Sequence, residues 1–375
     1  MYLDAASGAP LHPVALQALS AALADGWADP ARLYREGRQA DLLLSAARES
    51  LAECIGARPD EVSFTANGTT ALHAAVLGAM AGAEAGRTLL VHTAVEHSAV
   101  LYAAEHVAAS GAQVASVPVN DNGRVDPDAF VAAGTRPEAA VGVVQAANHE
   151  VGTRQPVTAI AGRVPQLPLV VDAAQVLAHE TPPAGWSVLT ADARMWGAPT
   201  LGILAVRTGR RWRSPYPADD REYRRVPGVP SVPVAVAAAA ALRAVADGRT
   251  ARAARLAALV GRIRDEVSRR IPDVQVLGDP DDRLPHIVTF SCLYADGEAV
   301  LSGLDRHGIS VNSGSSCTSQ TLAPSHVLVA MGALTSGNVR VSLHDGVTDA
   351  DVDRLLAVLP GVVAEVRDQL GAAGL

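Results

Sequence analysis

The chain has 375 residues, a formal net charge of −8, 49% hydrophobic residues and only 3% aromatic residues. This length allows two or three domains, and the negative charge disfavours nucleic acid or an anionic membrane as the main partner. The sequence has no apolar run of membrane-spanning length, no signal-peptide pattern at its start and only three cysteines, which cannot all pair. It therefore predicts a cytoplasmic protein without a disulfide framework.

Between about residues 60 and 206, short apolar runs alternate with helical stretches, including those at 69–81, 98–109 and 159–164. This alternation is typical of an α/β fold with a doubly wound, mostly parallel sheet, here of seven strands. Ligands of such sheets bind beyond the carboxyl ends of the strands. The predicted strands are Val62–Thr65, Thr88–His92, Gln113–Val117, Ala140–Gln145, Leu169–Asp172, Val188–Ala191 and Gly202–Val206.

The last third of the chain predicts a smaller α+β domain. Its elements are helices near 234–247, 252–271, 297–307 and 349–370 and a strand at 287–292. We expect residues 16–235 to form the large domain, and residues 1–15 with 236–375 to form the small one. The connection between them contains a segment rich in arginine and aromatic residues, Arg207–Arg225. We interpret it as a solvated or dimer-facing connection, with binding of nucleic acid or an acidic partner as the alternative.

The most distinctive segment is 312–326, where Cys317 lies in the run Asn-Ser-Gly-Ser-Ser-Cys-Thr-Ser-Gln-Thr-Leu-Ala-Pro-Ser-His. A cysteine among Ser, Gly and Thr residues is expected on a polar, accessible loop, where hydroxyl and backbone N–H groups support a thiolate. Taken alone, such a cysteine is more often an ordinary loop residue. No Cys or His spacing typical of a metal site occurs, so no metal is predicted.

This segment resembles the active-site loop of cysteine desulfurases, which are pyridoxal-phosphate enzymes of the class V aminotransferase type. The resemblance covers nearly the whole chain, from Tyr2-Leu3-Asp4 to Arg340-Val-Ser-Leu. It implies the fold of fold-type I pyridoxal-phosphate enzymes, a homodimer and a cofactor pocket. It also implies that Cys317 is the catalytic residue, which carries sulfur as a persulfide.

Several residues match cofactor positions of that family. Gly68 and Thr69 match the turn that cradles the phosphate at the start of a helix, where free N–H groups favour an anion. His97 matches the histidine that stacks on the pyridine ring, and Asp172 and Gln175 match the partners of the ring nitrogen and ring hydroxyl. Without the resemblance, these residues would be interpreted as an ordinary helix cap, a structural histidine and a strand-end cap.

Arg340 matches the arginine that binds the substrate carboxylate, a contact suited to a guanidinium fork. Other positions depart from the family pattern. His149 stands where the family has an asparagine next to the ring hydroxyl. Arg194 stands at the Schiff-base lysine, with Ala193 and Ala191 at the neighbouring histidine and phosphate-binding serine. All 31 basic residues of the chain are arginine, so no lysine is available to form an internal aldimine with the cofactor.

Three functions agree with this pattern. We favour a sulfur-transfer protein in which Cys317 accepts a persulfide sulfur from a donor protein and passes it to an acceptor in a thiolation or sulfur-trafficking pathway. The first alternative is an enzyme that binds pyridoxal or pyridoxamine phosphate non-covalently and acts on cysteine or a related amino acid, with His149 or His97 as the base. The second alternative is a non-catalytic pseudo-enzyme subunit or scaffold.

Overall fold

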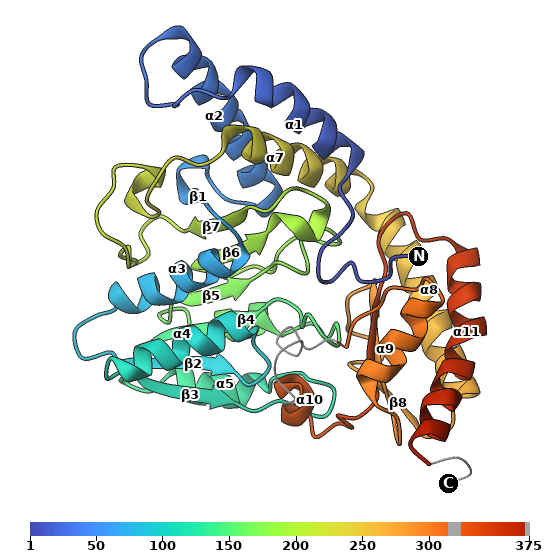
Figure 1. The fold of residues 1–375 in the computed structure, drawn as a ribbon. Helices are drawn as coiled ribbons and strands as arrows, with labels where there is room; N and C mark the ends of the chain where they lie inside the picture. The colour runs from blue at the N-terminus through green and yellow to red at the C-terminus, as the bar shows by residue number, and fades with distance from the viewer. Residues whose placement is uncertain (314–323, 372–375) are drawn as a thin grey trace.

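The computed structural model describes residues 1–313 and 324–371. Its main sheet has seven strands in the order β1-β7-β6-β5-β4-β2-β3 (Figure 1). They follow apolar runs whose side chains are buried nearly throughout, with the exception of the edge strand β3. The strands are β1 (Val62–Thr65), β2 (Leu89–Thr93), β3 (Gln113–Val117), β4 (Ala139–Gln145), β5 (Leu169–Asp172), β6 (Val188–Asp192) and β7 (Gly202–Val206).

The predicted doubly wound, mostly parallel sheet is confirmed. Neighbouring strands from β3 to β6 pair in parallel, and β7 alone runs against both of its neighbours, β6 and β1. The carboxyl ends of β1, β2, β4, β5 and β6 therefore lie at one edge of the sheet. The predicted strands match the observed ones to within one residue at either end.

Helices cover both faces of this sheet. One face carries α1 (Pro13–Asp25), α2 (Arg35–Ile55), α5 (Pro127–Gly134), α6 (Val157–Arg163) and α7 (Val232–Asp247), and the other carries α3 (Gly68–Ala81) and α4 (Ser98–Ala109). Local signals set their ends: Asn67 caps α3 by accepting a hydrogen bond from Thr70 N at 2.8 Å, and α2 ends at Gly56, whose φ of 67° suits glycine.

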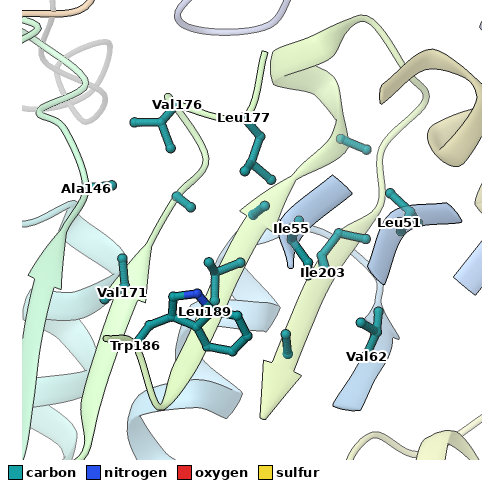
Figure 2. Close-up of a cluster of buried hydrophobic side chains, with 14 of the residues drawn as sticks. Leu51, Ile55, Val62, Ala146, Val171, Val176, Leu177, Trp186, Leu189 and Ile203 are labelled. Carbon is teal, nitrogen blue, oxygen red and sulfur yellow. The ribbon is translucent and has the colours of Figure 1, made fainter. Parts of the chain in front are cut away.

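The larger core lies between the sheet and the helices α1, α2 and α7. Figure 2 shows Leu51 and Ile55 of α2 gathered against Val62, Leu189 and Ile203 of three strands. Small and branched aliphatic side chains fill most of this interior, with Trp186 as one of its few aromatic members. The core thus has the composition expected of a helix-covered sheet.

A second core belongs to the C-terminal part of the chain, drawn in orange and red beside the main sheet in Figure 1. Here three strands pair in the antiparallel order β10-β9-β8. Leu3 joins this core because Tyr2 and Asp4 form bridges with Ser310 and Ser342. The elements are α8 (Arg249–Arg270), β8 (Val274–Leu277), β9 (Ile287–Cys292), α9 (Gly297–Arg306), α10 (His326–Ala330), β10 (Asn338–Ser342) and α11 (Asp349–Gln369).

Helix α7 is continuous and packs against α1 and α2. Its buried side chains, as far as Val245, belong to the larger core. The predicted domain boundary at residue 235 would pass through this helix, and the division into two domains stays a prediction. Within the described part of the chain, no helix combines the length and apolarity needed to cross a membrane.

Candidate active site

A cavity of about 560 Å³ opens at the carboxyl edge of the main sheet, next to β10 and α9. The cavity brings together residues from distant parts of the chain that the sequence singled out. They are Gly68, Thr69, His97, His149, Asp172, Gln175, Arg194 and Arg340. Ser313 also lines it, whereas Cys317 lies outside the described residues. The common location agrees with one ligand site, and the individual role of each residue stays a prediction.

The N-terminus of α3 enters the cavity with Gly68 and Thr69, and a carboxylate from the chain itself lies against it. The backbone N–H of Gly68 donates a hydrogen bond of 3.2 Å to Oδ2 of Asp192, the last residue of β6. A Cβ atom at Gly68 would lie only 2.7 Å from Asp192 Cβ and 2.8 Å from its Oδ2. Glycine is therefore required here, because the carboxylate fills the space against the start of the helix.

Arg194 lies on the short turn Ala193–Trp196 that follows β6, and it pairs with the same aspartate. Its Nη2 is 3.0 Å from Asp192 Oδ2 and its Nε is 3.2 Å from Oδ1. The hydrogen bonds to Asp192 raise the pKa of Arg194 above its already high ordinary value. The guanidinium is half exposed, at 46%, and stays a cation throughout the pH range of biology.

Asp172, His97 and His149 form another part of the cavity wall. Burial raises the pKa of Asp172 to about 6 although Ala174 N donates a hydrogen bond to its Oδ1 at 3.0 Å. Burial also lowers the pKa of His97 to about 4, and it lowers the pKa of His149 well below its ordinary value. The two imidazoles meet edge to face with ring centres 5.1 Å apart. This wall is thus formed by neutral rings and a carboxyl group that titrates close to neutrality.

Gln175 and Arg340 are already engaged by other parts of the chain. Nε2 of Gln175 donates to the carbonyl oxygen of Ala6 at 2.9 Å. The guanidinium of Arg340, which is buried, donates through Nη2 to Asp4 Oδ1 and Ser7 Oγ, each at 2.7 Å. Its Nη1 donates to the carbonyl oxygen of His149 at 2.9 Å. The arginine expected to bind a substrate carboxylate therefore already has a carboxylate partner.

The residues that sequence reasoning missed are the two acidic ones that neutralise these arginines, Asp192 and Asp4. Asp192 is the more predictable of the two, since it is an acidic residue at the carboxyl end of a buried strand, at the ligand-binding edge of the sheet. Asp4 comes close to Arg340 through long-range pairing between the N-terminus and β10, more than 330 positions away. No local pattern in the sequence indicates that contact.

The arginine-rich segment Arg207–Arg225 lies away from this cavity. Several of its cations have acidic partners: Arg207 contacts Glu61 at 3.0 Å, Arg211 contacts Glu84 at 3.2 Å and Arg221 contacts Asp29 at 3.0 Å. Arg207 also stacks over the ring of Trp186 at 3.6 Å. These contacts fit the interpretation as a structural connection, and a nucleic-acid or acidic partner stays an untested alternative. In the described part of the chain, no group of three or more His, Cys, Asp or Glu side chains is arranged to hold a metal ion.

Comparison with known proteins agrees with this fold. The family model of aminotransferase class V matches residues 1–195 and 211–355. A solved NifS-like protein superimposes with a TM-score of 0.89 at 23% identity, covering 97% of this chain and 99% of the other. The chain is therefore a member of the class V aminotransferase family.

Curated relatives narrow this assignment. A cysteine desulfurase of Cereibacter sphaeroides is 33% identical over 389 residues, covering 98% of this chain and 96% of the relative. A cysteine desulfurase of Trichormus azollae is 32% identical over 376 residues, covering 98% and 94%. Within the class V aminotransferases, the chain belongs to the cysteine desulfurase family, whose members depend on pyridoxal phosphate.

Proposed function

We propose that this protein transfers sulfur through a persulfide on Cys317 and does not use pyridoxal phosphate bound through a lysine. The observation that carries the proposal is the absence of lysine from a chain that keeps the Cys317 segment of the family. A lysine amine can lose its proton and attack the aldehyde of the cofactor, whereas a guanidinium stays protonated. Arg194, which stands at the lysine position in the family pattern, cannot replace that chemistry.

The cavity residues also support a function without pyridoxal phosphate bound through a lysine, because they match only part of that cofactor. Asp172, His97 and Gln175 line the cavity and match the side that faces a pyridine ring. The start of α3, where the phosphate would lie, already holds Asp192, and Arg340 is bound to Asp4. The residues present therefore do not fit pyridoxal phosphate at its phosphate group.

The proposed transfer is chemically balanced without an added oxidant. The thiolate of Cys317 attacks the outer sulfur of a donor persulfide, the donor S–S bond breaks, and the donor leaves as a thiolate. Cys317 then carries the sulfur as its own persulfide. A thiolate or another nucleophile of the acceptor attacks that outer sulfur and releases Cys317. We place this transfer in the cytoplasm, between a donor and an acceptor protein, with this chain as a homodimer.

Labelled sulfur tests the proposal directly. The protein is incubated with a persulfide donor that carries radioactive sulfur, and the label bound to the protein is counted. Intact mass spectrometry with and without reductant then measures the mass of the added sulfur. We expect wild type to gain one sulfur atom that reductant removes, and Cys317→Ser to gain none. Cys54→Ser is the matched control, because burial raises the pKa of Cys54 and makes it a poor thiolate. The proposal is wrong if wild type takes up no label or if Cys317→Ser takes up as much as wild type.

The same variants separate the two alternatives. A scaffold has no need of the thiol, so a complex that works equally well with Cys317→Ala would favour the scaffold. An enzyme with non-covalent pyridoxal or pyridoxamine phosphate is favoured by the shared location of Asp172 and His97 in one cavity. It predicts a visible absorption band when protein, cofactor and cysteine are mixed, and the absence of that band would exclude it.

A further inference from the structure

The contact between Asp192 and the start of α3 bears on what the cavity can bind. The first N–H groups of a helix have no partner within the helix and carry a partial positive charge, so they bind phosphate and other anions well. In this protein the N–H of Gly68 donates instead to Asp192 Oδ2 at 3.2 Å, and Asp192 is itself buried. An anion of the chain thus occupies the position that favours an anionic ligand.

The surrounding contacts hold Asp192 in that position. Its Oδ1 accepts a hydrogen bond from Arg194 N at 3.0 Å, and its Oδ2 lies 3.0 Å from Arg194 Nη2. Among the described residues that line the cavity, Arg194 is the cation beside this end of α3, and its charge is already neutralised by Asp192. A phosphate brought here would face a carboxylate at close range in a partly enclosed site, where like charges repel strongly.

The rest of the cavity still has polar groups without partners. His149 is only 7% exposed, and neither of its ring nitrogens has a hydrogen-bond partner among residues 1–313 and 324–371. Glu150 Oε1 stands 3.7 Å from its Nε2, beyond hydrogen-bond distance. Nε of Arg340 is likewise buried and has no partner within the described part of the chain. Buried polar groups in native proteins usually have a partner, so these atoms are available to hydrogen-bond a polar ligand in the 560 Å³ cavity.

We propose that Asp192 acts as a built-in substitute for a ligand phosphate and makes this cavity selective for small ligands without a phosphate group. The selectivity arises because the carboxylate satisfies the N–H of Gly68, occupies the space beside it and repels a second anion. Asp192 is thus a specificity-determining residue, whatever reaction the protein performs. The inference does not depend on sulfur transfer through Cys317.

A pair of ligands that differ only in the phosphate tests this proposal. Pyridoxine and pyridoxine 5′-phosphate are suitable probes, because neither has an aldehyde that would react with the N-terminal amine. Binding of both to the full chain is measured by calorimetry and by ligand fluorescence. Wild type should bind the phosphorylated probe no more tightly than pyridoxine. Inorganic phosphate should not compete for the site.

Two substitutions of Asp192 separate charge from space. Asp192→Ala opens the start of α3, and we expect it to bind pyridoxine phosphate about tenfold or more tighter than wild type does, since one hydrogen bond to a charged group changes affinity by at least that factor. Inorganic phosphate should now compete. Asp192→Asn removes the charge but keeps the side-chain volume and the hydrogen bond to Arg194 N, so its gain should be smaller.

Asp126→Ala is the matched control, because Asp126 caps α5 through Asp128 N at 3.0 Å and does not line the cavity. It should leave both affinities unchanged. The proposal is overturned if wild type prefers the phosphorylated probe by tenfold or more, or if neither Asp192 variant gains affinity for it. The affinity ratio of the two probes guards against partial unfolding, because both probes bind the same folded fraction. Since no sulfur is involved, failure here is distinct from failure of the Cys317 assay.

Discussion

The ion pair between Arg48 and Glu222 joins α2 to the segment that follows β7, and it allows a sharp test of how the main sheet is anchored. The two side chains are 8% and 4% exposed, and they pair through two contacts, Nη1–Oε2 at 2.9 Å and Nη2–Oε1 at 2.6 Å. Glu222 Oε2 also accepts a hydrogen bond from Phe64 N of β1 at 2.7 Å. The substitution Glu222→Gln keeps this shape and removes the negative charge.

The expected loss of stability follows from the buried charge that remains. Arg48 would be left without a counter-ion, and breaking a buried pair in this way costs about 3–5 kcal/mol. The entropy of unfolding is about 2.1 cal/mol/K per residue, or about 0.8 kcal/mol/K for 375 residues. The melting temperature should therefore fall by about 4–6 °C. The double variant Arg48→Met with Glu222→Gln should lose less, because neither charge is then buried.

Urea unfolding followed by circular dichroism, together with calorimetric melting, measures these differences. Glu266→Gln is the matched control, since Glu266 also contacts arginines, Arg269 and Arg270, but does so at the surface of α8. It should melt with wild type, because surface ion pairs contribute little. A loss below about 1 kcal/mol for Glu222→Gln, or a double variant less stable than the single one, would refute this reasoning.

Two further predictions concern pH and backbone packing. His179 and His286 stack with ring centres 3.8 Å apart, and burial lowers the pKa of His179 to about 3 and that of His286 well below its ordinary value of 6.5. Between pH 6.5 and 3 the unfolded chain thus binds more protons than the folded chain, so the free energy of unfolding should fall as the pH falls through this window. Urea titrations at several pH values measure this fall, and His179→Phe should make it shallower. Gly202→Ala places a Cβ atom against Thr65 Oγ1 and the Asn67 carbonyl oxygen, and should cost about 2 kcal/mol or more. Gly261→Ala meets no atom within 4 Å inside α8 and should stabilise by about 0.5–1 kcal/mol; equal effects of the two substitutions in urea unfolding would contradict the packing argument.

Much of the main sheet follows from local patterns that the sequence displays openly. The run Val188–Ala191 is mostly apolar and is flanked by turns, so its strand is predicted to within one residue of the observed Val188–Asp192. The pairing of strands is different. The consecutive strands β6 and β7 pair locally, whereas the pairing of β7 with β1 joins segments well separated in the chain and is decided by tertiary packing.

In the candidate site, too, some features follow from the sequence and others only from the folded structure. The resemblance identified the residues that line the cavity, including Asp172, His97 and Arg340, because they belong to motifs contiguous in sequence. It did not indicate that Asp4 binds Arg340 or that Asp192 binds both Gly68 and Arg194. The contacts of Asp4 with Arg340 and of Asp192 with Gly68 depend on distances of a few ångströms, which sequence spacing does not determine across 336 and 124 positions.

The sequence by itself determined the family, the order along the chain of the strands of the main sheet, and the absence of any lysine amine, since each is recorded in the identity and order of residues. Only the tertiary structure decided how the charges of the cavity are distributed. The folded chain brings Asp192 to the start of α3 and Asp4 to Arg340, so that two carboxylates of the chain itself pair with groups that favour an anion. The physical reason is that electrostatic and hydrogen-bond energies depend on distance and burial, which exist only once the chain has folded.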